Sequence, residues 1–226
     1  MSGQGAHERE ADKKRALLLT PVSRETQERL ETYVDLLLVW QEKFNLVAES
    51  TLPLVWTRHV ADSLQLIDLA PDAKVWADYG SGAGFPGIPI ACALAGTPGV
   101  HIHLIESVGK KAIFLREAVT ATQIPATVHH MRAENFGDSY GDNIDVVTAR
   151  ALSRLKVLCD QTFPLIKRGA LGIFPKGQDV EAELTEAAKY WTIEASKMPS
   201  KTSAEGCIVI IRSLNALKDP KAHPSG

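Results

Sequence analysis

A glycine-rich segment, DYGSGAGFPGIP, occupies residues 78–89 between two apolar runs. Its letters fit two ligand-binding patterns. From Gly82 they read G-x-G-x-x-G, which is typical of loops that hold the pyrophosphate of a dinucleotide. From Asp78 they read D-x-G-x-G-x-G, with a carboxylate directly before the glycines. The two patterns predict different ligands, because a carboxylate repels a phosphate but suits a cationic amine.

The placement of the loop favours the second pattern. The strand-like run VWADY stops before Gly80, so the frame that begins at Gly82 is displaced from the strand end where a dinucleotide loop starts. Phe85 and Pro86 also lie inside that frame, where a phosphate needs close approach. S-adenosylmethionine carries a cationic amine, a sulfonium and no phosphate. The loop therefore favours S-adenosylmethionine over a dinucleotide, with a purely structural glycine turn as a third alternative.

Strand-like and helix-like runs alternate after this loop. The second strand ends in Glu106, whose carboxylate can accept hydrogen bonds from the ribose hydroxyls of either ligand. We expect strands over 74–79, 100–106, 126–131, 143–149, 170–176, 191–197 and 207–213, and helices over 24–44, 53–68, 86–96, 109–122, 152–166 (ending near Pro164) and 179–190.

This alternation predicts an α/β fold with a doubly wound, mostly parallel seven-stranded sheet of the Rossmann-like type. The last two strands are joined by a connection too short for a helical crossover, so they should form an antiparallel C-terminal hairpin. Ser23 is a plausible N-cap for the first of the N-terminal helices. In such sheets ligands bind at the carboxyl ends of the strands.

Composition excludes several classes of protein. The net charge of −2 argues against coating nucleic acid by bulk electrostatics, although a local basic patch is compatible with it. No apolar run approaches the roughly 20 residues of a membrane span, and the N-terminus lacks a secretory apolar core. The three cysteines have neither disulfide nor zinc spacing. His101 and His103 alternate on one strand without a third ligand, so we predict no metal site and a cytoplasmic location.

Several ordered motifs, together with the loop, resemble those of the bacterial GidB/RsmG family of 16S ribosomal RNA guanine-N7 methyltransferases. The segments are LIESVGKKAIFLREA, MRAENF, DVVTARALSRLKVL and FPKG, with FNLVAES and WTRHVADSL upstream, and the resemblance covers about residues 30–213. Tyr79 departs from the family, which more often has a small aliphatic residue there. The resemblance implies a class I S-adenosylmethionine methyltransferase that acts on a guanine in helix 18 of 16S ribosomal RNA.

The resemblance also implies the division of the chain and the cofactor contacts. The expected parts are a flexible tail (1–20), a helical extension (21–70), the methyltransferase domain (71–213) and a second flexible tail (214–226). Asp78 should lie near the methionine moiety, and the segment after the third strand near the adenine. The expected cofactor-binding residues are Asp78, Gly80, Gly82, Phe85, Glu106, Ala133, Glu134 and Arg150.

Absent motifs indicate how the methyl group is transferred. After the fourth strand the chain has TARAL, and not the Asn/Asp-Pro-Pro-aromatic motif that methylates exocyclic amines. Cys159 has the surroundings of a core residue and not of a pyrimidine-attacking thiolate. Guanine N7 has an in-plane lone pair and no proton, so its attack needs no base. We therefore expect direct in-line transfer without a general base and without a catalytic side chain, although such absences also fit a protein that is not an enzyme.

Basic residues at the expected active face are candidates for RNA contact. Arg150 and Arg154 could position the guanine, or they could form surface ion pairs. Lys110 and Lys111 begin a helix, where cations are mildly unfavourable unless they serve another role. The expected RNA-binding residues are Lys110, Lys111, Arg132, Arg154 and Lys176.

His59, Asp62 and Ser63 share one helical region and fit either a structural hydrogen-bonded group or a group that closes over the site. We expect a monomer whose partner is 16S ribosomal RNA, a small ribosomal subunit or an assembly intermediate. The competing functions are a methyltransferase for a small molecule or protein, a dinucleotide-dependent oxidoreductase and a non-catalytic RNA-binding module.

Overall fold

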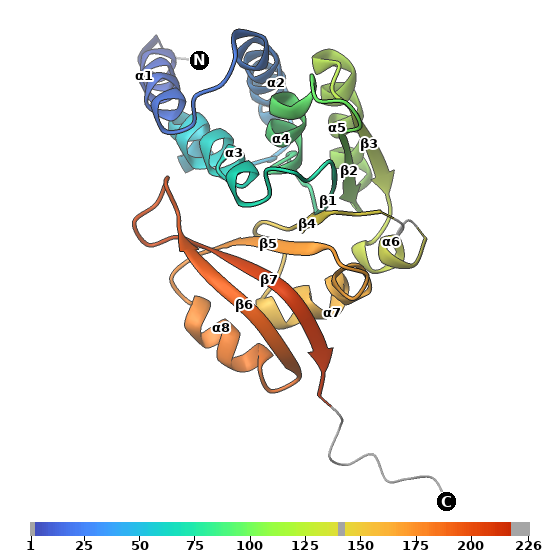
Figure 1. The fold of residues 1–226 in the computed structure, drawn as a ribbon. Helices are drawn as coiled ribbons and strands as arrows, with labels where there is room; N and C mark the ends of the chain where they lie inside the picture. The colour runs from blue at the N-terminus through green and yellow to red at the C-terminus, as the bar shows by residue number, and fades with distance from the viewer. Residues whose placement is uncertain (1–2, 140–142, 218–226) are drawn as a thin grey trace, which may run out of the picture.

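A computed structural model describes residues 3–139 and 143–217 of the chain. Its centre is a seven-stranded sheet with the strand order β3-β2-β1-β4-β5-β7-β6, in which only β7 pairs antiparallel with its neighbours (Figure 1). The predicted mostly parallel sheet with an antiparallel C-terminal hairpin is therefore confirmed. The strands are β1 (Val75–Tyr79), β2 (His101–Glu106), β3 (Ala126–His130), β4 (Val146–Thr148), β5 (Leu171–Lys176), β6 (Trp191–Pro199) and β7 (Cys207–Ala216).

Helices cover both faces of the sheet, because each face carries its own apolar cluster. Successive residues of β1 alternate between the two clusters: Trp76 lies in the first, and Ala77 and Tyr79 lie in the second. The ring of Tyr79 packs edge-on against Phe136 at a centroid distance of 6.0 Å, so its large side chain is a packing feature. The covering helices are α4 (Gly87–Leu94), α5 (Gly109–Thr122), α6 (Ala133–Ser139), α7 (Leu155–Ile166) and α8 (Val180–Ala187).

Within residues 1–20, which the sequence predicts as a flexible tail, the structure has helix α1 (Gly3–Leu19). Asp12 explains the order of this segment. Its buried carboxylate accepts hydrogen bonds from the backbone N–H groups of Trp56 and Thr57, at 2.9 and 3.0 Å, and from the Thr57 hydroxyl. These N–H groups begin a helical segment and need acceptors, so Asp12 anchors α1 against it.

The next helix, α2 (Arg24–Gln41), begins as predicted, since the Ser23 hydroxyl accepts a hydrogen bond from the Thr26 N–H at 3.2 Å. It ends before the predicted 44, because the Gln41 side chain accepts from the N–H of Leu46 and holds a turn there. The single helix predicted over 53–68 is instead four short pieces: η1 (Glu49–Leu54), η2 (Trp56–Ala61), α3 (Asp62–Leu64) and η3 (Ile67–Leu69).

Other differences lie at element boundaries. Helix α6 occupies a segment for which the sequence predicts no element, and α7 begins at Leu155 and not at the predicted 152. Strand β7 runs to Ala216, beyond the predicted 213, while residues 218–226 of the expected second tail lie outside the described residues. None of the helices in the described ranges is long and apolar enough to cross a membrane.

Candidate active site

The glycine loop after β1 is held open by backbone geometry that only glycine adopts easily. Gly80, Gly82 and Gly84 have φ angles of 66°, 57° and 95°, in the left-handed region. A Cβ atom on Gly80 would lie 2.5 Å from Cδ1 of Leu152, so the segment after β4 packs directly on the loop. The Tyr33 hydroxyl of α2 donates to the Ala83 carbonyl and fixes the loop from the N-terminal side.

Asp78 lies beneath this loop. Its carboxylate is buried and accepts hydrogen bonds from the Gly87 N–H at 3.2 Å and from the Thr148 hydroxyl at 3.1 Å. Burial raises the pKa of Asp78 to about 7, against the opposing effect of these hydrogen bonds. The carboxylate therefore shapes the start of α4 and the end of β1 from inside the core, and it is not presented at the surface.

Glu106, at the end of β2, ties two backbone segments together. One carboxylate oxygen accepts from the Gly82 N–H at 2.9 Å, and the other accepts from the Val108 N–H at 2.6 Å. Each oxygen retains a second lone pair, so both can still accept a hydroxyl hydrogen bond. Glu106 therefore lies directly beside the glycine loop.

The segment after β3 supplies the outer part of the site. Arg132 precedes α6, and the buried Ala133 and the exposed Glu134 form its first turn. The Gln161 side chain donates to the Glu134 carboxylate at 2.8 Å, and this hydrogen bond is the main reason that the pKa of Glu134 is lowered.

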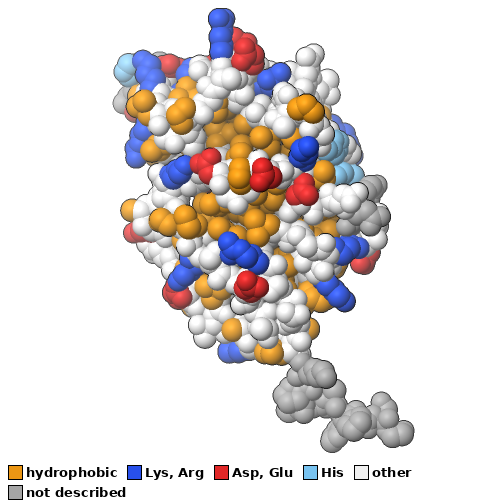
Figure 2. All heavy atoms as spheres, in the orientation of Figure 1, with side chains coloured by type: hydrophobic (Ala, Val, Ile, Leu, Met, Phe, Trp, Pro, Cys, Tyr) orange, Lys and Arg blue, Asp and Glu red, His pale blue; other side chains and the backbone are white. Residues whose placement is uncertain are grey.

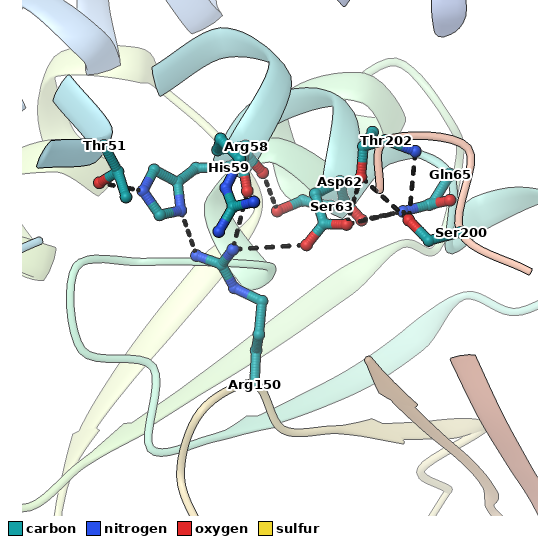
Figure 3. A network of polar contacts seen from close by, with 9 residues as sticks. All are labelled: Thr51, Arg58, His59, Asp62, Ser63, Gln65, Arg150, Ser200 and Thr202. Carbon is teal, nitrogen blue, oxygen red and sulfur yellow. Dashed lines mark hydrogen bonds and ion pairs between the residues drawn. The ribbon is translucent and has the colours of Figure 1, made fainter. Parts of the chain in front are cut away.

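Arg150, directly after β4, is the centre of a polar network (Figure 3). Its guanidinium lies 2.8 Å from Nδ1 of His59 and 3.4 Å from a carboxylate oxygen of Asp62, and it donates to the Arg58 carbonyl at 3.1 Å. The same guanidinium lies over the ring of Phe85, 5.1 Å from its centroid. Arg150 therefore joins the glycine loop to the helical extension.

His59 is a neutral acceptor in this network. An arginine can only donate, so Nδ1 of His59 must accept, and Nε2 carries the hydrogen that faces the Thr51 hydroxyl at 2.9 Å. Burial, with the nearby charges of Arg150 and Arg58, lowers the pKa of His59 to about 3. Both ring nitrogens are therefore in use, and the ring stacks on Phe85 at 4.9 Å.

Asp62 extends the network to the connection between β6 and β7. Its second carboxylate oxygen accepts from the Thr202 hydroxyl at 2.7 Å and from the Gln65 amide at 2.9 Å. Ser63 instead donates to the His59 carbonyl at 2.6 Å. The two residues predicted as a pair, His59 and Asp62, are thus joined through Arg150.

A cavity of about 570 Å³ opens on the far side of Arg150 from the glycine loop. Lys176 lies in its wall and is mostly buried, because it forms an ion pair with Glu183 at 2.6 Å and donates to the Ser153 carbonyl at 2.9 Å. The cavity is lined by Arg58, His59, Asp62, Arg150, Ala151, Leu152, Ser153, Arg154, Pro175, Lys176, Gly177, Gln178, Glu183, Ser200, Thr202, Ser203, Glu205, Gly206, Cys207 and Ile208.

The predicted basic residues do not form one patch. Arg154 and Lys176 line the cavity, whereas Lys110, Lys111 and Arg132 lie outside it. The Lys110 ammonium lies over the Phe44 ring at 4.9 Å. Figure 2 shows basic and acidic side chains side by side across the face it presents, without a continuous basic surface. Lys176 is therefore a paired cavity residue, and not a free member of a rim shared with the two α5 lysines.

Among the charged lining residues, sequence reasoning missed Arg58, Glu183 and Glu205. Arg58 adjoins the recognised His59, so its position was available from the sequence. Glu205 lies in the β6–β7 connection, which no local pattern relates to the strand ends. Among the described residues, no group of three or more histidine, cysteine, aspartate or glutamate side chains could hold a metal ion.

The strand order places these residues along one edge of the sheet. The carboxyl ends of β3, β2, β1, β4 and β5 lie side by side in that sequence, so the α6 start, Glu106, the glycine loop, Arg150 and Lys176 follow one another along one edge. We call the part of this edge from β3 to β1 the glycine-loop half. The part from β4 to the β6–β7 hairpin is the cavity half.

Comparisons with known proteins identify the chain. Residues 26–211 match the GidB family, described as rRNA small subunit methyltransferase G. A protein of that name from Bradyrhizobium sp. (strain BTAi1 / ATCC BAA-1182) is 58% identical over 89% of this chain and 90% of its own, and one from Nitrobacter hamburgensis is 58% identical over 88% and 76%. The solved structure of a cofactor-bound protein from MTB shares the fold, with a TM-score of 0.56 and 14% identity over 90% of this chain and 97% of its own. The chain therefore belongs to the GidB family and is, as the sequence predicts, an S-adenosylmethionine-dependent rRNA methyltransferase.

Proposed function

We propose that this protein transfers the methyl group of S-adenosylmethionine to N7 of a guanine in helix 18 of 16S ribosomal RNA. The observation that carries the proposal is the position of Arg150, which contacts Phe85 of the glycine loop and also lines a nucleotide-sized cavity, while Glu106 holds the same loop. Cavities of about 300–1,000 Å³ are typical of small-molecule and base pockets, and this one lies within that range.

The residues of the glycine-loop half fit the cofactor. Gly80 and Gly82 let the backbone approach a ligand closely, and Glu106 has free lone pairs for ribose hydroxyls. Ala133 and Glu134 begin α6 after β3, the strand next to β2, and in our proposal they contact the adenine. Asp78 acts here through the loop that it supports. When bound, the cofactor supplies an electrophilic methyl group on its sulfonium.

Direct transfer without a general base suits the residues beside Phe85. His59 cannot take a proton there, because both of its ring nitrogens are engaged and its pKa is about 3. Guanine N7 attacks with its own lone pair, so the protein contributes orientation. Arg150 is held by three partners at the boundary between the two halves, and Arg154 lines the adjoining cavity. Both can donate to O6 of the base, which leaves the N7 lone pair free to attack.

RNA would reach the cavity from outside and pass Lys110, Lys111 and Arg132. We propose that the protein acts as a monomer in the cytoplasm, on a small ribosomal subunit or an assembly intermediate. The protruding β6–β7 connection forms part of the cavity wall, so the RNA must present its base as an unpaired or flipped-out nucleotide.

The proposal is tested with small-subunit particles and naked 16S RNA from a strain that lacks the activity. Each is incubated with the protein and S-adenosylmethionine, and the product is mapped by mass spectrometry. We expect one added methyl group on N7 of a helix 18 guanine. Methylation at another atom or nucleotide would correct the target, and the absence of any RNA methylation would refute the proposal. Stabilisation by NAD and not by S-adenosylhomocysteine would favour an oxidoreductase.

A further inference from the structure

Most charged side chains around the cavity already have partners. Arg150 is paired with Asp62, and Lys176 is paired with Glu183. The Glu183 oxygen that contacts Lys176 also accepts from the Leu155 N–H at 2.7 Å. These groups fix the shape of the cavity walls.

The β6–β7 connection, residues 200–206, differs along its length. Its first part is tied to the helical extension: the Thr202 hydroxyl donates to Asp62 at 2.7 Å, and the Lys201 N–H donates to Gln65 at 2.8 Å. Ser203 and Glu205, in its second part, belong to the cavity lining. Within the described residues, neither of their side chains has a hydrogen-bond or ion-pair partner. Cys207, which follows this part, pairs with Lys176 of β5, so Glu205 lies beyond β4 from the glycine loop. An anchored segment therefore brings an unpaired carboxylate to the lining of the cavity on the side away from the loop.

The chemistry of N7 transfer fixes the orientation of the base. N7 must face the methyl donor, which lies on the glycine-loop side of Arg150 in the proposed arrangement. The Watson–Crick edge of a purine lies on the side opposite N7, so it must face the wall across the cavity. In guanine that edge carries two adjacent donors, N1–H and the N2 amino group. A carboxylate can accept from both at once.

We infer that Glu205 reads the target base by accepting hydrogen bonds from N1–H and the N2 amino group of guanine. The inference deepens the proposed function and rests on it. Adenine presents a lone pair at N1 and has no N2 amino group, so it would be repelled by the same carboxylate. Glu205 is thus a specificity-determining residue, and Arg150 and Arg154 are left for O6, with N7 free to attack.

The test compares guanine with inosine, which lacks only the N2 amino group and retains N7. Small subunits are reconstituted with 16S RNA that carries either base at the mapped target position. For the unmodified protein, we expect inosine to lower kcat/KM about tenfold or more, as for a lost hydrogen bond to a charged group. Glu205→Ala should lower kcat/KM on guanine by a larger factor, because it removes the hydrogen bond from N1–H as well, and it should bring the guanine-to-inosine ratio close to one. Glu205→Gln, which keeps the shape of the side chain, should fall between them.

Two controls separate specificity from folding. Binding of S-adenosylhomocysteine should be unchanged in the Glu205 variants. Glu117→Ala removes the same charge from an exposed position on α5 and should leave the base ratio as it is. If Glu205→Ala slows both RNAs equally, or neither, the inference is wrong and the proposed function stands. If the unmodified protein methylates no RNA, the proposed function and the inference fall together.

Discussion

The two halves of the strand-end edge are built in different ways. In the glycine-loop half, the key hydrogen bonds join residues close in sequence: Asp78 to Gly87 across 9 positions, and Gly82 to Glu106 across 24. In the cavity half, Arg150 reaches Asp62 across 88 positions, and Asp62 reaches Thr202 across 140. The glycine loop and Glu106 come from one βαβ unit, whereas the residues of the cavity half come from segments far apart in the chain.

This difference has a physical consequence. Positive φ angles and backbone N–H groups define the first half, so it changes little unless a glycine or its buried support is replaced. Long polar side chains from three separate segments define the second half, and such side-chain contacts open more readily than core backbone. We therefore expect substitutions in the glycine-loop half to act through steric clashes and the electrostatics of the core. Substitutions in the cavity half should act by releasing side chains that orient the substrate.

The largest effect is expected from Gly80→Asp. The new side chain would need a left-handed backbone and would meet Leu152, whose Cδ1 lies 2.5 Å from the Cβ position. Binding of S-adenosylhomocysteine, measured by calorimetry, should weaken at least about 100-fold. Gly96→Ala is the matched control, because nothing lies within 4 Å of its Cβ position. Normal binding by Gly80→Asp would remove the glycine loop from the cofactor site.

Asp78→Asn tests the core electrostatics of the same half. The pKa of Asp78 is about 7 in the folded protein against an ordinary 3.8, so the folded state disfavours the carboxylate. This group therefore reduces the free energy of unfolding as pH rises from about 4 to about 7, by an amount on the order of 4 kcal/mol. The asparagine variant lacks this dependence.

Urea denaturation of both proteins at pH 5 and pH 8 measures the effect. The stability of Asp78→Asn relative to the unmodified protein should be higher at pH 8 than at pH 5. Asp72→Asn, in an exposed turn, should show no such change. An equal stability difference at the two pH values would mean that Asp78 is ionised throughout this range in the folded state.

Arg150 tests the boundary between the halves. Arg150→Ala removes the group that holds His59 and Asp62 beside Phe85, and we expect kcat to fall about 100-fold, as for the loss of a positioned transition-state donor. Arg150→Lys keeps the charge but loses the planar guanidinium that donates to several partners at once, so it should recover only part of the rate. Single-turnover kinetics and cofactor binding are measured together. If binding of S-adenosylhomocysteine falls as far as kcat, Arg150 belongs to the cofactor half.

The same contrast explains what could be predicted from the sequence. The sheet, its hairpin and the glycine loop follow from local patterns, and the pairing of Glu106 with the loop follows from parallel strand ends. The order of α1 could not be predicted, because it depends on Asp12, which meets Trp56 across 44 positions. Local polarity gives no sign of that contact.

The cavity half was only partly predictable. Arg150 and Arg154 follow a strand and were found, but their surroundings were not. The fragmentation of 53–68 into short helical pieces places Arg58, His59 and Asp62 around Arg150, which helix periodicity alone does not indicate. Lys176 was expected on an open rim, yet Glu183 from the following helix turns it into a buried ion pair. Long-range partners decide these roles.

The smallest expected effect tests whether RNA spans both halves. Lys110 and Lys111 begin α5, beside β2 and outside the cavity, so contact with RNA there would extend the interface across the cofactor side. Replacing both lysines by glutamate should raise the KM for RNA about tenfold and lower the salt dependence of binding by about 1–2 units of slope, since each phosphate contact on a single strand contributes about 0.7. Binding of S-adenosylhomocysteine should change much less.

Lys74→Glu, at the amino end of β1, is the control on the opposite edge of the sheet. Equal losses of RNA and cofactor binding would show that the two lysines support the cofactor half, and that the RNA interface is confined to the cavity.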